Sequence, residues 1–179
     1  MHGFSYSLHI LAYLQKWVGP GVKQSGIDDD TWSDHTDVRP TMLLLSGLQD
    51  PYQSDGRVLV EGLQHSALPP SARGGLFQLL ATAYKQLNAP LGVFGQATLK
   101  ISTAALASGS VNDDSKYQSL ESKLSALTAQ RDAVATQIKT ALDGAEFRGQ
   151  PLDPGAALQL FIKAETILVQ VSVLASRGL

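Results

Sequence analysis

The feature that most constrains the fold is an apolar seam in the second half of the chain. Its members recur at alternating three- and four-residue steps, interrupted at Arg131: Tyr117, Leu120, Leu124, Leu127, Val134, Ile138, Ala141 and Ala145. This period is typical of a long α-helix that buries one face against other helices. Ser115 and Gln118 have the S-x-x-Q spacing of a capping box, so we expect the helix to begin there.

A second long helix is predicted directly after the first. Asp153 and Pro154 supply an N-cap and a first-turn proline, and apolar residues then cover most of the helix circumference between Ala157 and Leu174. Because the connection between the two helices is short, they are expected to run in opposite directions side by side. The sequence therefore predicts a long antiparallel helical hairpin over residues 116–145 and 155–176.

Shorter helices are predicted upstream of this hairpin. Pro69-Pro70 is a good entry to a helix that closes at Asn88 and Pro90, and a further helix runs from about Gln96 to Leu106. The first of these two helices has an apolar face, formed by Leu76, Phe77, Leu80, Ala83, Tyr84 and Leu87.

Residues 1–63 have a different character, because they are rich in Gly, Pro, Asp and Ser and break into short pieces. They predict a helix over Ser7–Val18 that Gly19-Pro20-Gly21 ends, a short helix over 39–48, and a short strand over Arg57–Val60. We therefore expect a mainly α fold, in which the C-terminal hairpin packs on shorter helices with one or two short strands. The expected division of the chain is into residues 1–63 and 64–179.

Charge and composition exclude several classes of function. The formal net charge is −2, and no basic face can be found, which argues against nucleic acid as a partner. The most apolar stretch, 156–175, contains Gln159, Lys163, Glu165 and Gln170, so it is interpreted as a core helix and not as a membrane span. The chain has no cysteine nucleophile, G-x-S-x-G elbow, Walker-type loop or H-E-x-x-H motif.

The acidic run from Asp34 to Asp37 is the chemically richest local pattern. Asp34, His35 and Asp37 could converge on a cation, since two carboxylates and an imidazole lie within four residues. The interpretation that we favour is that Asp37 caps the helix entered at Pro40. His9 lies on the apolar side of its predicted helix and is interpreted as a packed histidine.

The order of four sequence runs resembles a known family. The runs are HG at residue 2, GPGV at 19, W-S-D-H-T-D-V-R-P-T-M-L-L-L-S-G-L from Trp32, and D-G-R-V-L from Asp55. Together they resemble the C-terminal end of the catalytic domain in bacterial members of the alkaline phosphatase superfamily, which includes nucleotide pyrophosphatases and sulfatases. The helical remainder resembles a C-terminal extension of some of these phosphoesterases.

For the full-length relative the resemblance implies a divalent metal, zinc first among the candidates, and a phosphate-ester substrate, whereas this fragment alone need not hold a metal. His2 matches a metal-ligating histidine of the family, whereas Asp37-Val38-Arg39-Pro40-Thr41 matches an element with a structural role, and His35 matches no ligand. The family's nucleophile and its remaining ligands have no counterpart in this sequence. The resemblance thus implies a fragment that is inactive in isolation, from an extracellular or periplasmic enzyme, although no signal peptide is recognisable here.

Two alternatives from other classes remain open at this stage. The chain could be a helical interaction module with a vestigial N-terminal segment, which self-associates through the helices over 116–145 and 155–176. It could also be a complete small metalloenzyme that uses His2, Asp34, His35 and Asp37, although zinc catalysis requires three protein ligands and an open position.

Overall fold

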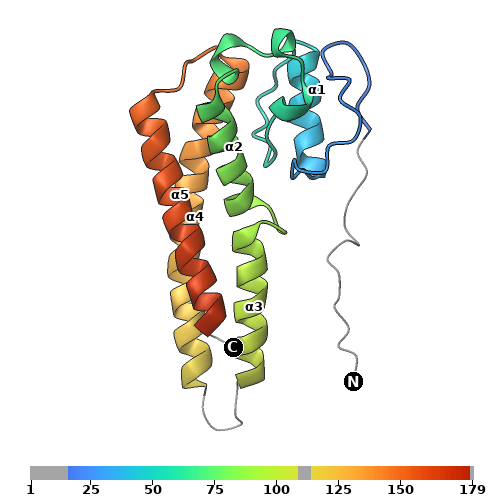
Figure 1. Cartoon of the computed structure of the whole chain (residues 1–179). Coiled ribbons are helices and arrows are strands. Elements are labelled where there is room, and N and C mark those ends of the chain that lie inside the picture. Colours follow the sequence, from blue (N-terminus) through green and yellow to red (C-terminus); the bar gives the residue numbers. More distant parts are fainter. Residues whose placement is uncertain (1–15, 109–113, 178–179) are drawn as a thin grey trace.

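The computed structural model of the protein describes residues 16–108 and 114–177, and these are mainly helical. The predicted C-terminal hairpin is confirmed: helix α4 (Ser115–Phe147) and helix α5 (Pro154–Arg177) run antiparallel (Figure 1). Asp153 caps α5 as expected, because its carboxylate accepts a hydrogen bond from the backbone N–H of Ala156 at 2.7 Å. Helix α4, however, begins at Ser115 itself with Asp114 at the N-cap position, so Ser115 is not the cap that the S-x-x-Q pattern predicted.

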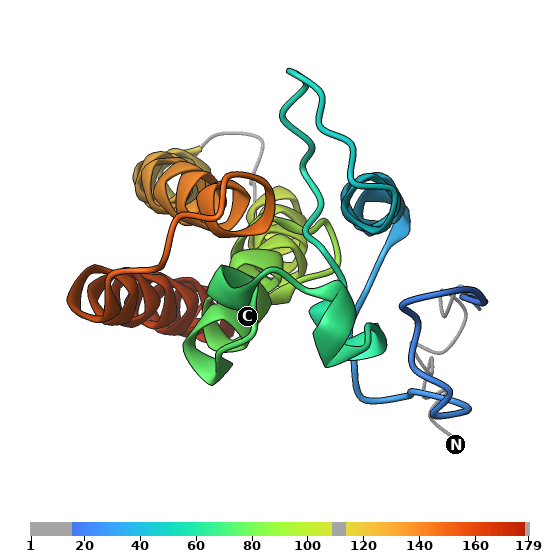
Figure 2. The same ribbon diagram turned by 90° about the horizontal axis from the view of Figure 1, so that it is seen from above.

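The shorter upstream helices are α2 (Gly75–Asn88) and α3 (Val93–Ser108). They lie nearly end to end along the hairpin, so that the bundle has three columns, formed by α2 with α3, α4 and α5 (Figures 1 and 2). Pro90 lies in the break between them. Helix α2 begins later than predicted, because Pro70–Ala72 forms a separate 3-10 turn, and α3 begins three residues earlier than Gln96.

The core of the bundle uses the predicted apolar faces. Buried side chains from the three columns include Phe77, Leu80, Leu87, Ile101, Val134, Ile138, Leu142, Ala164, Ile167 and Val171. Val58, Val60 and Leu63, which precede α2, belong to the same cluster of buried residues. One hydrophobic core therefore joins part of the N-terminal stretch to the helices.

Helix α5 is long and apolar enough to cross a membrane by length and composition, with a mean hydropathy of 1.5 over its best window. It is the one helix of the described ranges that meets this test, and 28% of that window is buried within the protein. In the structure α5 packs against α2, α3 and α4, but one side of it is exposed, so the predicted core helix is buried on one face only.

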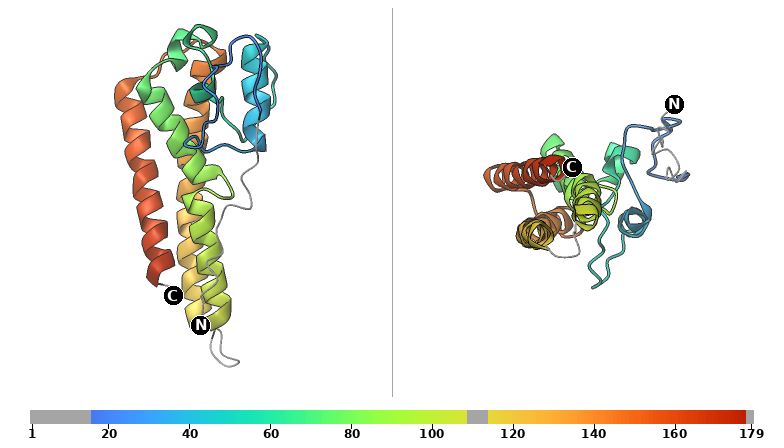
Figure 3. Two further views of the ribbon diagram at one scale, coloured as in Figure 1. Left: turned by 45° about the vertical axis from the view of Figure 1, so that its right-hand side comes forward. Right: turned by 90° about the horizontal axis from the view of Figure 1, so that it is seen from below.

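The short helix predicted over residues 39–48 is α1 (Val38–Leu45), at the side of the bundle (Figure 3). It ends in a Schellman motif, in which the N–H of Leu48 bonds to the carbonyl of Leu43 at 2.9 Å and that of Gly47 to Leu44 at 3.1 Å. Gly47 has a φ of +65°, a conformation that glycine adopts at little cost.

The predicted strand over Arg57–Val60 is wrong. Val60 already belongs to a 3-10 turn, Val60–Gly62, and the pairing found in the described chain is one isolated antiparallel bridge between Val22 and Leu63. The predicted helix over Ser7–Val18 lies outside the described residues except for 16–18, which are not helical.

Candidate functional site

The acidic run folds into a short turn beside α1. His35–Asp37 forms a 3-10 turn whose N-cap is Asp34, and Asp34 and Asp37 make a reciprocal capping box. Asp37 occupies the N-cap position of α1 but makes no side-chain cap bond there, so the prediction that its carboxylate caps that helix is wrong. The carboxylate of Asp37 instead accepts a hydrogen bond from the N–H of Asp34 at 3.0 Å.

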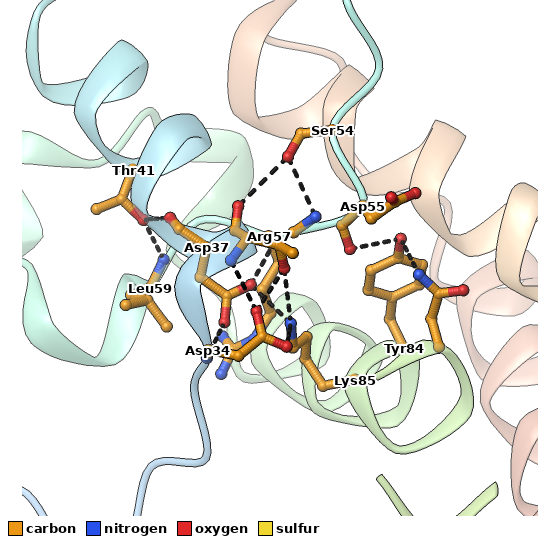
Figure 4. Close-up of polar contacts among 12 residues, drawn as sticks. Asp34, Asp37, Thr41, Ser54, Asp55, Arg57, Leu59, Tyr84 and Lys85 are labelled. Carbon is orange, nitrogen blue, oxygen red and sulfur yellow. Dashed lines mark hydrogen bonds and ion pairs between the residues drawn. The ribbon is translucent and has the colours of Figure 1, made fainter. Parts of the chain in front are cut away.

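The ammonium of Lys85, on α2, occupies the centre of this turn (Figure 4). It lies 2.9 Å from Asp37 Oδ1, 3.0 Å from Asp34 Oδ2 and 3.3 Å from Thr36 Oγ1. Because an ammonium has three N–H donors, these three oxygens satisfy it. The Lys85 side chain is 2% exposed, and the Trp32 ring centroid lies 5.2 Å from the same nitrogen.

Asp37 also holds the segment that was predicted as a strand. Its Oδ1 accepts a hydrogen bond from the N–H of Arg57 at 2.9 Å, while Oγ1 of Thr41 accepts one from the N–H of Leu59 at 3.0 Å. Thr41 donates its own hydroxyl hydrogen to the carbonyl of Asp37 at 2.7 Å. Asp37 and Thr41 are fully buried. We refer to Asp34, Asp37, Thr41 and Lys85 as the Lys85 cluster.

A third side chain takes the remaining N–H of this segment. Oε1 of Glu146, on α4, accepts a hydrogen bond from the N–H of Val58 at 3.2 Å. The backbone N–H groups of residues 57, 58 and 59 thus each donate to a side-chain oxygen. In chain order, the acceptors are the N-cap residue of α1, a residue of α4 and a residue of α1. Side-chain acceptors have taken the place of a neighbouring strand, which is why no strand forms.

Two buried charged side chains near this segment, Arg57 and Glu146, differ in how completely their polar atoms are paired. Arg57 pairs with Glu61 at 2.8 Å, and both carboxylate oxygens of Glu61 accept from it. Glu146 is 3% exposed, its Oε2 has no hydrogen-bond partner among the described residues, and burial raises its pKa to about 7 against the attraction of Lys139. Although desolvation opposes it, hydrogen bonds from Thr36 and Lys85 lower the pKa of Asp34.

A small polar pocket adjoins the Lys85 cluster. Its volume is about 240 Å³, and its lining includes Asp34, Asp55, Lys85 and Asn88. At its edge the hydroxyl of Tyr84 donates to the carbonyl of Asp55 at 2.9 Å and accepts from Asn88, and burial together with the charge of Asp55 raises the pKa of Tyr84. The Tyr84 hydroxyl thus links the backbone carbonyl of Asp55 to the Asn88 amide.

A larger pocket of about 350 Å³ lies between the loop after α1 and the end of α4, lined by Tyr52, Lys139, Asp143 and Phe147 among others. The ammonium of Lys139 is bonded to Asp143 at 2.5 Å, so its charge is neutralised within the pocket wall.

The structure brings together part of the candidate metal site. Asp34 and Asp37 converge as predicted, but the cation between them is Lys85, and His35 is an exposed residue of the turn. His2 and His9 lie outside the described residues. Within residues 16–108 and 114–177 no group of three or more His, Cys, Asp or Glu side chains could hold a metal ion. The described part thus gives no support to a metalloenzyme built on Asp34, His35 and Asp37.

Sequence reasoning missed Lys85 and Glu146, which complete the site from α2 and α4. Lys85 does carry a weak signal, because it is eight residues from Phe77 and four from Ala81 and so lies beside the buried apolar face of its helix. Glu146 directly follows Ala145, the last member of the apolar seam, and has no comparable signal.

Comparison with known proteins adds no relative. No family model matches the chain, and neither a curated protein nor a solved structure is significantly similar to it.

Proposed function

We propose that this chain is the C-terminal part of a metal-dependent phosphoric-ester hydrolase, and that its described residues act as a scaffold and not as catalysts. The observation that carries the scaffold role is the Lys85 cluster. It joins the two runs that resemble the alkaline phosphatase superfamily, Asp34–Leu48 and Asp55–Leu59, to each other and to α2. The residues of these two runs therefore have a structural role, since they hold this part of the fold together.

The pairing of charges within the Lys85 cluster also supports a scaffold role for these residues. A carboxylate whose oxygens already bind a buried ammonium and backbone N–H groups has little remaining capacity for a metal ion. Catalytic groups for a phosphate-ester substrate would then come from residues beyond the described ones, with His2 as the proposed ligand of a divalent metal, zinc first. The family assignment itself rests on the order and spacing of the four sequence runs.

An activity assay tests this proposal. The purified 179-residue chain, mixed with p-nitrophenyl phosphate or its bis ester and with zinc, manganese or calcium, should release no nitrophenol above a protein-free control. Metal-dependent turnover that is lost in His2→Ala but retained in the matched variant His9→Ala would contradict the scaffold role. In the genomic DNA upstream of the Met1 codon we expect an in-frame nucleophile motif with Asp and His ligands, and an unrelated upstream sequence would contradict the family assignment.

A second candidate function is a helical interaction module. It is favoured by one specific observation, the exposed apolar face of α5, which does not depend on any link to hydrolases. The seam of α4 is less suited to binding a partner, because Leu120, Val134, Ile138 and Ala145 are buried within the bundle.

A further inference from the structure

An apolar stripe runs along the outer face of α5. It consists of Leu158, Ile162, Val169 and Val173, whose exposed fractions are 49%, 55%, 59% and 41%. Their spacings of four, seven and four residues place them on one side of the helix. The core-facing side carries other residues, among them Ala157, Ala164, Ile167 and Val171, which are at most 4% exposed. We call the four exposed residues the α5 stripe.

The flanks of the α5 stripe carry opposite charges. At 100° per residue, Glu165 lies on one side of the stripe, and Lys163 lies on the other side together with Gln159 and Gln170. Lys163 and Glu165 are exposed, and neither takes part in an ion pair within the described part of the chain. Because polar residues border the stripe, its apolar part is one helix wide.

We infer that the α5 stripe is the contact between two copies of this chain, with their α5 helices parallel. When two helices are parallel and related by a twofold axis along their length, the Lys163 flank of one copy lies beside the Glu165 flank of the other. Lys163 of each copy therefore faces Glu165 of its partner. In an antiparallel pair centred on the stripe, the two Glu165 side chains would instead meet on the same side and repel each other. Charge complementarity therefore selects both the second copy as occupant and the parallel direction.

The size of the stripe sets the strength of this contact. From Leu158 to Val173 the helix rises about 22 Å, and a strip of that length and about 10 Å width falls well below the roughly 800 Å² per partner of a stable complex. The dimer is therefore expected to be weak and to form at high protein concentration. The inference is independent of the proposed hydrolase role, since its test measures association and not turnover.

Sedimentation equilibrium of the full chain tests the contact. Between about 10 µM and 1 mM the wild type should shift from monomer to dimer. Ile162→Glu should weaken association at least about tenfold, whereas the matched control Leu99→Glu, at a residue 67% exposed on α3, should leave it unchanged. Lys163→Glu should weaken association, and the double swap Lys163→Glu with Glu165→Lys should restore it. A wild type that stays monomeric at 1 mM, or equal effects of Ile162→Glu and Leu99→Glu, would overturn the contact.

The chain contains no cysteine, so disulfide cross-linking can report the helix direction without background. In the parallel arrangement, Leu158→Cys alone should give a covalent dimer under mild oxidation. In an antiparallel arrangement, Leu158→Cys would instead cross-link to a chain carrying Val173→Cys, which would overturn the parallel direction. Co-sedimentation of a monomeric wild type with phosphatidylcholine vesicles would overturn the dimer and identify a lipid surface as the occupant.

Discussion

Replacing Glu146 by glutamine should stabilise the protein at neutral pH and leave it unchanged at pH 4.5. Burial raises the pKa of this carboxyl from an ordinary 4.5 to about 7, with Lys139 and the N–H of Val58 opposing the shift. The folded protein therefore holds a proton on Glu146 that the unfolded chain has released by about pH 5. Glutamine mimics this protonated side chain, since its amide oxygen can still accept the hydrogen bond from Val58.

The sign and size follow from proton linkage. Because the folded state binds the extra proton, the free energy of unfolding is highest below pH 4.5, falls as the pH rises toward 7, and is level above it. One pKa unit corresponds to about 1.4 kcal/mol, so the difference between 4.5 and about 7 amounts to about 3 kcal/mol. This group therefore acts in a different pH window from Asp34, whose lowered pKa stabilises the fold above pH 3.8 and loses its effect as the pH falls below that value.

Urea unfolding, followed by circular dichroism at half-unit steps from pH 4.5 to 8, measures this directly. The wild type should lose about 3 kcal/mol across the range, whereas Glu146→Gln should stay level and exceed the wild type at pH 8. Glu121→Gln, an exposed carboxylate on the same helix, is the matched control and should keep the wild-type slope. A level wild-type curve, or a Glu146→Gln variant less stable than wild type at pH 8, would refute the reasoning.

Three further predictions concern the Lys85 cluster and its surroundings, each measured by urea unfolding at pH 7. Lys85→Met should cost about 3–5 kcal/mol, because it leaves the buried carboxylate of Asp37 and the partly buried one of Asp34 without their cation, and a loss below about 1 kcal/mol would contradict that role. Thr41→Val should cost about 1–3 kcal/mol by leaving a buried N–H without an acceptor, while Thr140→Val on the exposed side of α4 should be nearly neutral. Gly56→Ala should cost more than about 2 kcal/mol, since its Cβ would lie 2.0 Å from a backbone oxygen, and Gly62→Ala, with nothing within 4 Å, should not share that steric cost.

The sequence predicts the helical bundle well because its signals are local and repeated. The seam of α4, the Asp153 cap of α5 and the glycine after α1 each appear within a few residues of the feature they determine. The strand predicted over Arg57–Val60 is wrong for the opposite reason. Its apolar residues have strand propensity, but propensity does not reveal whether the backbone N–H groups will meet another strand or a set of side chains. Here Asp37, Thr41 and Glu146 supply the acceptors, and Glu146 is 88 residues distant from its partner.

The acidic run shows what a local pattern can and cannot specify. Because Asp34, Thr36 and Asp37 lie within four residues, their side-chain oxygens come close together in the turn. Two carboxylates in such proximity need a cation between them. That much follows from the sequence of the loop. The identity of the cation does not, because Lys85 is 48 residues from Asp37 and arrives only through the packing of α2. The ammonium of Lys85 occupies the position between the two carboxylates that a metal ion would take, so the packing of α2 supplies the turn with its cation.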